Sequence, residues 1–212
     1  MKLKVCGMKF NTKEVAVLQP DYLGFIFYEK SKRNFEDAEI PNLPKSIQKV
    51  GVFVDAEYAF AKANILAHNL DIIQLHGSES PLYIEELKNE LKLAGKENLQ
   101  WWKVFGIEDS FDFKKLFPYQ KHVDAFLFDT KGKEKGGNGY TFDWSVLEDY
   151  NLQTPIVLSG GIGLDQIEGL KKILKTDLPI TAIDVNSKFE TKPGLKVIDD
   201  LKELKKLMDV NL

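Results

Sequence analysis

The sequence predicts an α/β fold, and more narrowly a (β/α)8 TIM barrel formed by a single domain over residues 1–212. Short apolar runs recur eight times along the chain, and their starts lie roughly 20 to 31 residues apart. Apolar residues at helical spacing follow most of these runs, as expected where helical crossovers join parallel strands. A doubly wound sheet usually stops at about five to seven strands, so eight units in about 200 residues favour the barrel.

In the first half of the chain, apolar runs end in small or polar residues. Such short runs, rich in β-branched and aromatic residues, are typical of strands in a parallel sheet. The strands predicted here are Leu3–Cys6, Tyr22–Phe27, Lys49–Val54 and Asp71–Leu75. Helical spacing predicts helices over Thr12–Leu18, 57–67 and Pro81–Lys92. Pro41 and Pro44 predict a loop between the second and third strands.

The second half of the chain repeats the same pattern. The strands predicted here are Trp101–Phe105, Ala125–Phe128, Pro155–Leu158 and Thr181–Val185. The helices predicted between and after them are Ser110–Phe117, Asp143–Tyr150 and Leu195–Met208. A polar, glycine-rich loop is expected over Lys131–Gly139.

The stretch Pro155–Ile162 shows most clearly how a strand leads into a possible ligand site. After the apolar run comes a turn at Ser159, Gly160 and Gly161, and helical spacing resumes at Leu164. Two glycines let the backbone approach a ligand closely, and free N–H groups at a turn favour an anion. The same residues also suit a tight turn without a ligand.

Composition excludes several classes of partner. The net charge of −3 and the pI near 5.7 provide no basic surface, so neither nucleic acid nor an anionic membrane is expected to bind. The single cysteine cannot form an internal disulfide, and the polar N-terminus does not resemble a signal peptide. No run of about 18 apolar residues is present. We therefore expect a cytoplasmic protein.

Metal and nucleotide cofactors are not expected either. The histidines His68, His76 and His122 have no ligand spacing, and neither a G-x-G-x-x-G nor a Walker A sequence occurs. No nucleophile-elbow serine supports a hydrolase.

In a barrel of this kind the active site lies at the C-terminal ends of the strands, so the residues there are candidates. Several of these residues could also have a purely structural role. Cys6 is also typical of a small buried apolar residue, and Arg33 of surface charge. Asp55 is interpreted as a helix N-cap, and Asp129 also suits a cap. The remaining candidates are Gln74, His76, Ser159, Gly160, Gly161, Asp184, Asn186 and Ser187.

These strand ends resemble the phosphoribosylanthranilate isomerases of tryptophan biosynthesis. The resemblance extends in order through eight blocks of the chain. They are 4–7 (KVCG), 24–27 with 31–33 (GFIF, SKR), 51–54 (GVFV), 74–77 (QLHG), 128–130 (FDT), 136–139 with 142–144 (GGNG, FDW), 158–161 (LSGG) and 184–187 (DVNS).

The resemblance implies an Amadori rearrangement without a cofactor, by general acid-base catalysis on a small phosphorylated substrate. Asp129 is expected to be the acid that protonates the ring oxygen, and must then hold a proton at working pH. Cys6 is expected to be the base, with a thiol pKa brought toward neutrality by nearby positive potential. Arg33 is expected to hold the anthranilate carboxylate. The other substrate-binding residues implied are Gln74, Gly137, Ser159, Gly160, Gly161, Asp184, Asn186 and Ser187.

The chain departs from the family pattern at a few positions. Lys188 stands where a glycine is expected after Ser187, and it would either add positive charge near the phosphate or narrow the approach to the backbone. The run after Gly7 is bulkier than expected, and Val197 stands where the family often has aspartate.

Three alternatives remain at this point. The imidazole carboxamide isomerases catalyse a similar reaction but use a carboxylate at the first strand end, where this chain has Cys6. Metal-dependent pentose phosphate epimerases need paired His and Asp ligands. A barrel that only binds a ligand or a protein is the third. The chain is expected to be a monomer or a homodimer.

Overall fold

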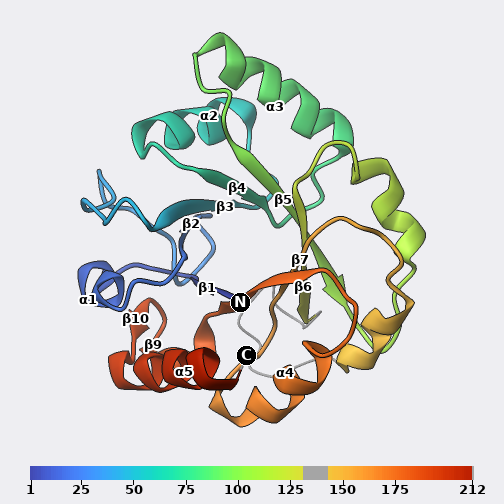
Figure 1. The fold of residues 1–212 in the computed structure, drawn as a ribbon. Helices are drawn as coiled ribbons and strands as arrows, with labels where there is room; N and C mark the ends of the chain where they lie inside the picture. The colour runs from blue at the N-terminus through green and yellow to red at the C-terminus, as the bar shows by residue number, and fades with distance from the viewer. Residues whose placement is uncertain (131–142, 212) are drawn as a thin grey trace.

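The structure, a computed structural model, describes residues 1–130 and 143–211, and it contains a closed barrel of eight strands (Figure 1). Each strand pairs in parallel with its neighbour in the chain, and β8 pairs with β1 to close the barrel. The predicted fold class is thus confirmed. The strands are β1 (Lys2–Val5), β2 (Tyr22–Phe27), β3 (Gln48–Phe53), β4 (Ile72–Leu75), β5 (Gln100–Ile107), β6 (Ala125–Thr130), β7 (Ile156–Leu158) and β8 (Ile180–Val185).

The crossovers between strands are less regular than the strands themselves. The α-helices are α1 (Thr12–Val17), α2 (Tyr58–Ala67), α3 (Pro81–Leu93), α4 (Ile167–Ile173) and α5 (Ile198–Asn211). The segment between β2 and β3 contains no helix, as Pro41 and Pro44 predict. The segments predicted as helices after β5 and before β7 are 3-10 helices, η1 (Phe113–Tyr119) and η2 (Trp144–Asp149). Pro118 lies inside η1 and cannot donate an α-helical hydrogen bond.

Two expectations about local structure are wrong. The last helix begins at Ile198 rather than Leu195, because Leu195–Lys196 forms strand β10, which pairs antiparallel with β9 (Glu190–Lys192). Gly194 makes that turn with a φ of 86°. Asp55 does not cap α2, whose N-cap is Glu57. The carboxylate of Asp55 instead accepts a hydrogen bond from the backbone N–H of Ser78, in the loop after β4.

The barrel contains two apolar layers. Side chains that fill its interior form one cluster, in which the rings of Tyr22 and Trp102 meet edge to face with centroids 5.1 Å apart. The larger cluster lies between the outside of the sheet and the helices. None of the described helices is long and apolar enough to cross a membrane. The packed interior leaves the C-terminal ends of the strands as the place where polar side chains can meet.

Candidate active site

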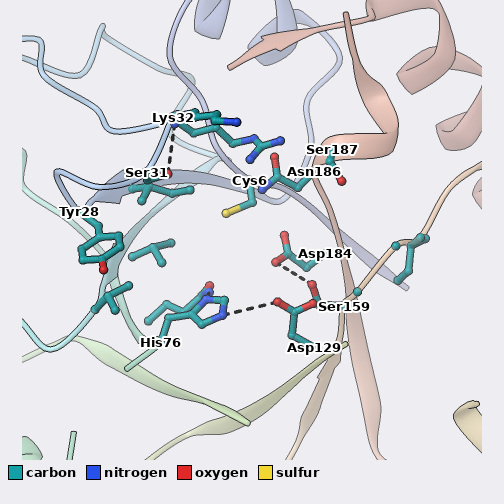
Figure 2. A pocket seen from close by; sticks show the side chains of 18 of the residues that line it. Cys6, Tyr28, Ser31, Lys32, His76, Asp129, Ser159, Asp184, Asn186 and Ser187 are labelled. Atoms are coloured by element: carbon teal, nitrogen blue, oxygen red, sulfur yellow. Dashed lines mark hydrogen bonds and ion pairs between the residues drawn. The ribbon is translucent and has the colours of Figure 1, made fainter. Parts of the chain in front are cut away.

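A cavity of about 500 Å³ opens at the C-terminal end of the barrel (Figure 2). Its size is in the range of small-molecule sites. Every predicted site residue that the structure describes lines it, although these residues come from separate strands and loops. They are Cys6, Arg33, Gln74, Asp129, Ser159, Gly160, Gly161, Asp184, Asn186 and Ser187. Gly137, with the whole of the predicted glycine-rich loop Lys131–Gly139, lies outside the described residues.

Cys6 follows β1, and its sulfur occupies space that a neighbouring glycine provides. A side chain at Gly24 on β2 would place its Cβ 2.8 Å from Cys6 Sγ. The thiol is 4% exposed, and this burial raises its pKa. Lys4 lowers the pKa, Asp184 raises it and Lys196 lowers it, with a net upward direction. The expectation that positive neighbours bring this pKa toward neutrality is therefore wrong for the protein without substrate.

Asp129 lies near the end of β6, within reach of two polar neighbours. Its Oδ1 accepts a hydrogen bond of 2.9 Å from the N–H of Thr130, and its Oδ2 lies 3.5 Å from Nε2 of His76. Burial, followed by the charge of Asp184, raises the pKa of Asp129 to about 7. A substantial fraction of the carboxyl therefore keeps its proton at neutral pH, as a proton donor must.

Two oxygen atoms in the cavity are buried and have no hydrogen-bond partner among the described residues. They are Oδ1 of Asp184 and Oε1 of Gln74. The other oxygen of Asp184 is satisfied, since Oδ2 accepts hydrogen bonds from Lys4 Nζ at 2.9 Å and Ser159 Oγ at 3.3 Å. Because buried acceptors are rarely left unpaired, these two atoms suit a ligand that carries hydroxyl groups.

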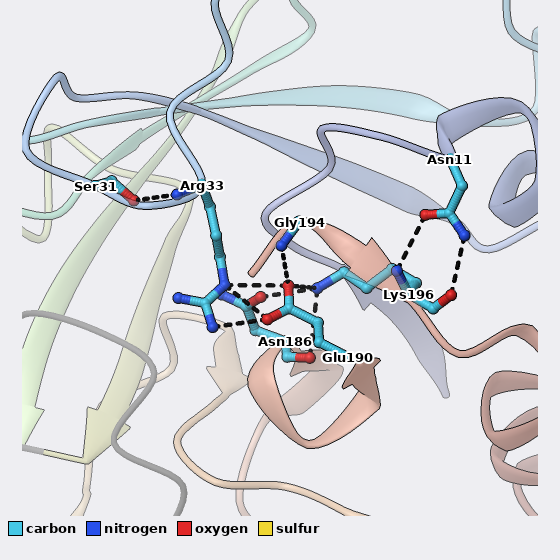
Figure 3. A network of polar contacts seen from close by, with 7 residues as sticks. All are labelled: Asn11, Ser31, Arg33, Asn186, Glu190, Gly194 and Lys196. Atoms are coloured by element: carbon cyan, nitrogen blue, oxygen red, sulfur yellow. Dashed lines mark hydrogen bonds and ion pairs between the residues drawn. The ribbon is translucent and has the colours of Figure 1, made fainter. Parts of the chain in front are cut away.

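Arg33 is held by a carboxylate that the sequence analysis did not single out (Figure 3). Its Nε lies 3.0 and 2.9 Å from the two carboxylate oxygens of Glu190, and its Nη2 lies 2.7 Å from Oε2. Oε1 also accepts hydrogen bonds from Lys196 Nζ at 2.7 Å and from the N–H of Gly194 at 3.0 Å. One edge of the guanidinium is thereby fixed. The rest of the group borders the cavity.

Gly160 and Gly161 both have positive φ angles, of 88° and 66°. A Cβ at Gly160 would lie 2.3 Å from Thr130 Oγ1 and 2.4 Å from its nitrogen, so the absence of a side chain is required for packing as well as for access to a ligand. Lys188 lines the same side of the cavity, and its Nζ lies 3.9 Å from a carboxylate oxygen of Asp165. The ammonium group of Lys188 is thus close to the carboxylate of Asp165.

Three buried charges next to cavity residues were not predicted from the sequence, namely Lys4, Glu190 and Lys196. A signal for Lys4 was present, because it precedes Cys6 by two residues in a strand and so projects to the same face. Glu190 and Lys196 had no such signal, because they belong to a hairpin that replaces the expected start of the last helix.

Comparison with known proteins assigns the family. The family model described as N-(5'-phosphoribosyl)anthranilate isomerase matches residues 3–209. The chain belongs to this family. The enzyme of that name from Parabacteroides distasonis is 41% identical over 209 residues, which cover 95% of this chain and 90% of the relative. The predicted family, and with it an isomerase of tryptophan biosynthesis, is confirmed.

Solved isomerases of the family share the fold. One is described as monomers generated from the dimeric enzyme of Thermotoga maritima, with 26% identity and a TM-score of 0.75. Another is a complex with reduced 1-(o-carboxyphenylamino)-1-deoxyribulose 5-phosphate, with 26% identity and a TM-score of 0.76. In both cases the match covers 99% of this chain and 99% of the other.

The fit of Gly160 against Thr130 predicts a large loss of stability when a methyl group is added. Gly160→Ala is expected to lower the free energy of unfolding by about 1–3 kcal/mol more than Gly95→Ala, as measured by urea denaturation. Gly95 is a matched control, because its φ is 76° and nothing lies within 4 Å of an added Cβ. Equal losses in the two variants would show that the contact with Thr130 is unimportant.

Proposed function

We propose that the cavity carries out the rearrangement of N-(5-phosphoribosyl)anthranilate to 1-(2-carboxyphenylamino)-1-deoxyribulose 5-phosphate with Asp129 as general acid and Cys6 as general base. The observation that supports these roles best is that a carboxyl with a pKa near 7 and a lone thiol line one cavity. They lie near the ends of β6 and β1, which are three strands apart around the barrel, so they can act on different parts of one substrate.

In the first step, the proton of Asp129 passes to the furanose ring oxygen while the bond from that oxygen to C1 breaks. The lone pair of the anthranilate nitrogen forms the C=N bond, and the product is a cationic Schiff base. The thiolate of Cys6 then removes the proton from C2, and the electrons of that C–H bond neutralise the iminium. The resulting enol becomes the ketone by moving a proton from its oxygen to C1. Asp129 regains a proton and Cys6 loses one through solvent.

The raised pKa of the Cys6 thiol is compatible with this order of events. An opposite charge within about 4–6 Å favours the ionised form of a group. The Schiff base is a cation formed in the cavity that Cys6 lines, so it lowers the thiol pKa at the stage when a base is needed.

The remaining groups of the substrate have complementary sites. Arg33 and Lys32 border the cavity near one end, and we assign the carboxylate of the anthranilate ring to Arg33. Ile26, Val52 and Val54 form an apolar wall for that ring. We assign the ribose hydroxyls to the unpaired oxygens of Gln74 and Asp184. The part of Gly137 in substrate binding stays a prediction.

We assign the phosphate to the part of the cavity between Gly160 and Gly161 and the segment at Asn186 and Ser187, with Lys188 adding charge. Small residues there expose backbone N–H groups, which bind anions.

We further propose that the reaction needs no cofactor and that the protein is cytoplasmic, where its single thiol stays reduced. A monomer and a homodimer are both compatible with this site.

Substitutions at the two central residues test the proposal. Anthranilate fluorescence reports turnover as N-(5-phosphoribosyl)anthranilate is consumed. Cys6→Ser is expected to lower kcat by about 10² or more, since a hydroxyl is a far weaker acid than a thiol. Asp129→Asn is expected to abolish turnover while a reduced product analogue still binds, because the amide keeps its size but has no proton to deliver.

Asp109→Asn, at an exposed aspartate that does not line the cavity, is the control and should leave kcat unchanged. Wild-type turnover in Cys6→Ala would remove Cys6 from the mechanism. Analogue binding without turnover in the unmodified protein would identify a barrel that only binds its ligand.

The two pKa directions predict an unusual pH dependence of kcat/KM. Asp129, with a pKa of about 7, must be protonated, and Cys6, with a raised pKa, must be ionised. The required form is therefore always a minority. Its fraction rises with pH up to about 7, stays level above that, and falls only beyond the pKa of the thiol. A profile that is level below pH 7 and falls above it would show that the thiol ionises before the carboxyl.

A further inference from the structure

Lys4 is a fully buried lysine to which the proposed mechanism gives no role. Its side chain is 0% exposed, and its Nζ lies 2.9 Å from Oδ2 of Asp184. The two residues are direct partners in the register of β1 and β8. Taking an ammonium group out of water costs several kcal/mol unless it is paired. A lysine retained at this position therefore needs an explanation beyond filling the interior of the barrel.

The position of Lys4 on β1 provides that explanation. It precedes Cys6 by two residues, so both side chains project into the barrel, and the positive charge of the ammonium group acts on the thiol. Burial alone would lower the pKa of Lys4, but Asp184 and Cys6 raise it, and the net direction is upward. Lys4 thus stays charged beside the sulfur.

The other groups around Cys6 show how this charge is balanced. On β8, Asp184 opposes ionisation of the thiol, and on β10, Lys196 favours it. On β2 the neighbour is Gly24, which has no side chain. Lys4 is the cation with the largest effect on the thiol. Asp184 both holds Lys4 in place and cancels part of its charge.

We propose that Lys4 is a positioning residue of this enzyme, which holds its ammonium group between Asp184 and Cys6 and supplies the positive charge against which the Cys6 thiolate forms. The proposal rests on the role of Cys6 as base. When the thiolate takes the proton from C2, the ammonium loses one of its two anionic partners but keeps Asp184. Lys4 therefore needs no movement during turnover.

The reactivity of the thiol tests this proposal without requiring turnover. Cys6 is the only cysteine of the chain, so alkylation by iodoacetamide, followed by intact-protein mass spectrometry, reports on it alone. The rate of alkylation at a fixed pH near 8 is proportional to the small thiolate fraction. Lys4→Gln, which keeps a hydrogen-bond donor but removes the charge, is expected to lower this rate about tenfold or more.

Three further variants complete the set. Lys4→Arg should keep a rate near that of the wild type, because the charge remains. Asp184→Asn should raise the rate, because it leaves the charge of Lys4 uncompensated. Lys2→Gln is the matched control, a lysine on the same strand whose Nζ bonds the hydroxyl of Tyr22 away from the thiol, and it should change nothing.

A substitution that merely destabilises the fold gives a different pattern of alkylation rates. Exposure of Cys6 to water would bring the thiol toward its ordinary reactivity, so every destabilised variant would be alkylated faster. An unchanged or faster rate in folded Lys4→Gln would overturn the proposal. Should that variant fail to fold, the neutral pair Lys4→Gln with Asp184→Asn replaces it, and it must react more slowly than Asp184→Asn alone. Slow alkylation of Lys4→Gln with full turnover would retain the role of Lys4 but refute Cys6 as the base.

Discussion

The ion pair between Lys4 and Asp184 is the interaction on which the rest of the site depends. It joins the first and last strands of the barrel, 180 residues apart in the chain, at the point where the sheet closes. Cys6 directly follows β1, and Asp129 lies close enough for the charge of Asp184 to raise its pKa. One buried pair thus influences both residues proposed to move protons, in opposite chemical roles.

The buried charged side chains around this pair do not balance, because positive charges outnumber negative ones by one. Lys4 pairs with Asp184, while Arg33 and Lys196 share the carboxylate of Glu190, so three cations face two anions. Burial lowers the pKa of Lys196. Either the Cys6 thiolate or an anionic group of the substrate can balance the extra positive charge. The Cys6 thiolate and an anionic group of the substrate are therefore alternative partners for the same positive charge, while burial raises the pKa of the thiol.

The barrel strands were predictable because apolar runs and their spacing depend on local sequence, and each of the eight lies within a few residues of its predicted position. The residues at their ends were predictable because parallel strands end at one edge. The burial of Lys4, Glu190 and Lys196 was not predictable, because a buried charged residue in a sequence looks the same as a solvated one. Only the face on which Lys4 projects followed from its spacing to Cys6. Their burial depends on pairing across the barrel closure and in the hairpin around Gly194, and neither is a local property.

The protonation of Asp129 tests the account most directly, because burial and the charge of Asp184 must both act for it to differ from an ordinary aspartate. A 13C NMR titration of the protein labelled at its aspartate carboxyl carbons, with Asp129→Asn used to identify the resonance, measures it. The account predicts a midpoint at about pH 7. A midpoint near the ordinary aspartate value of about 4 would contradict it, since Asp129 would then have no proton to donate at neutral pH.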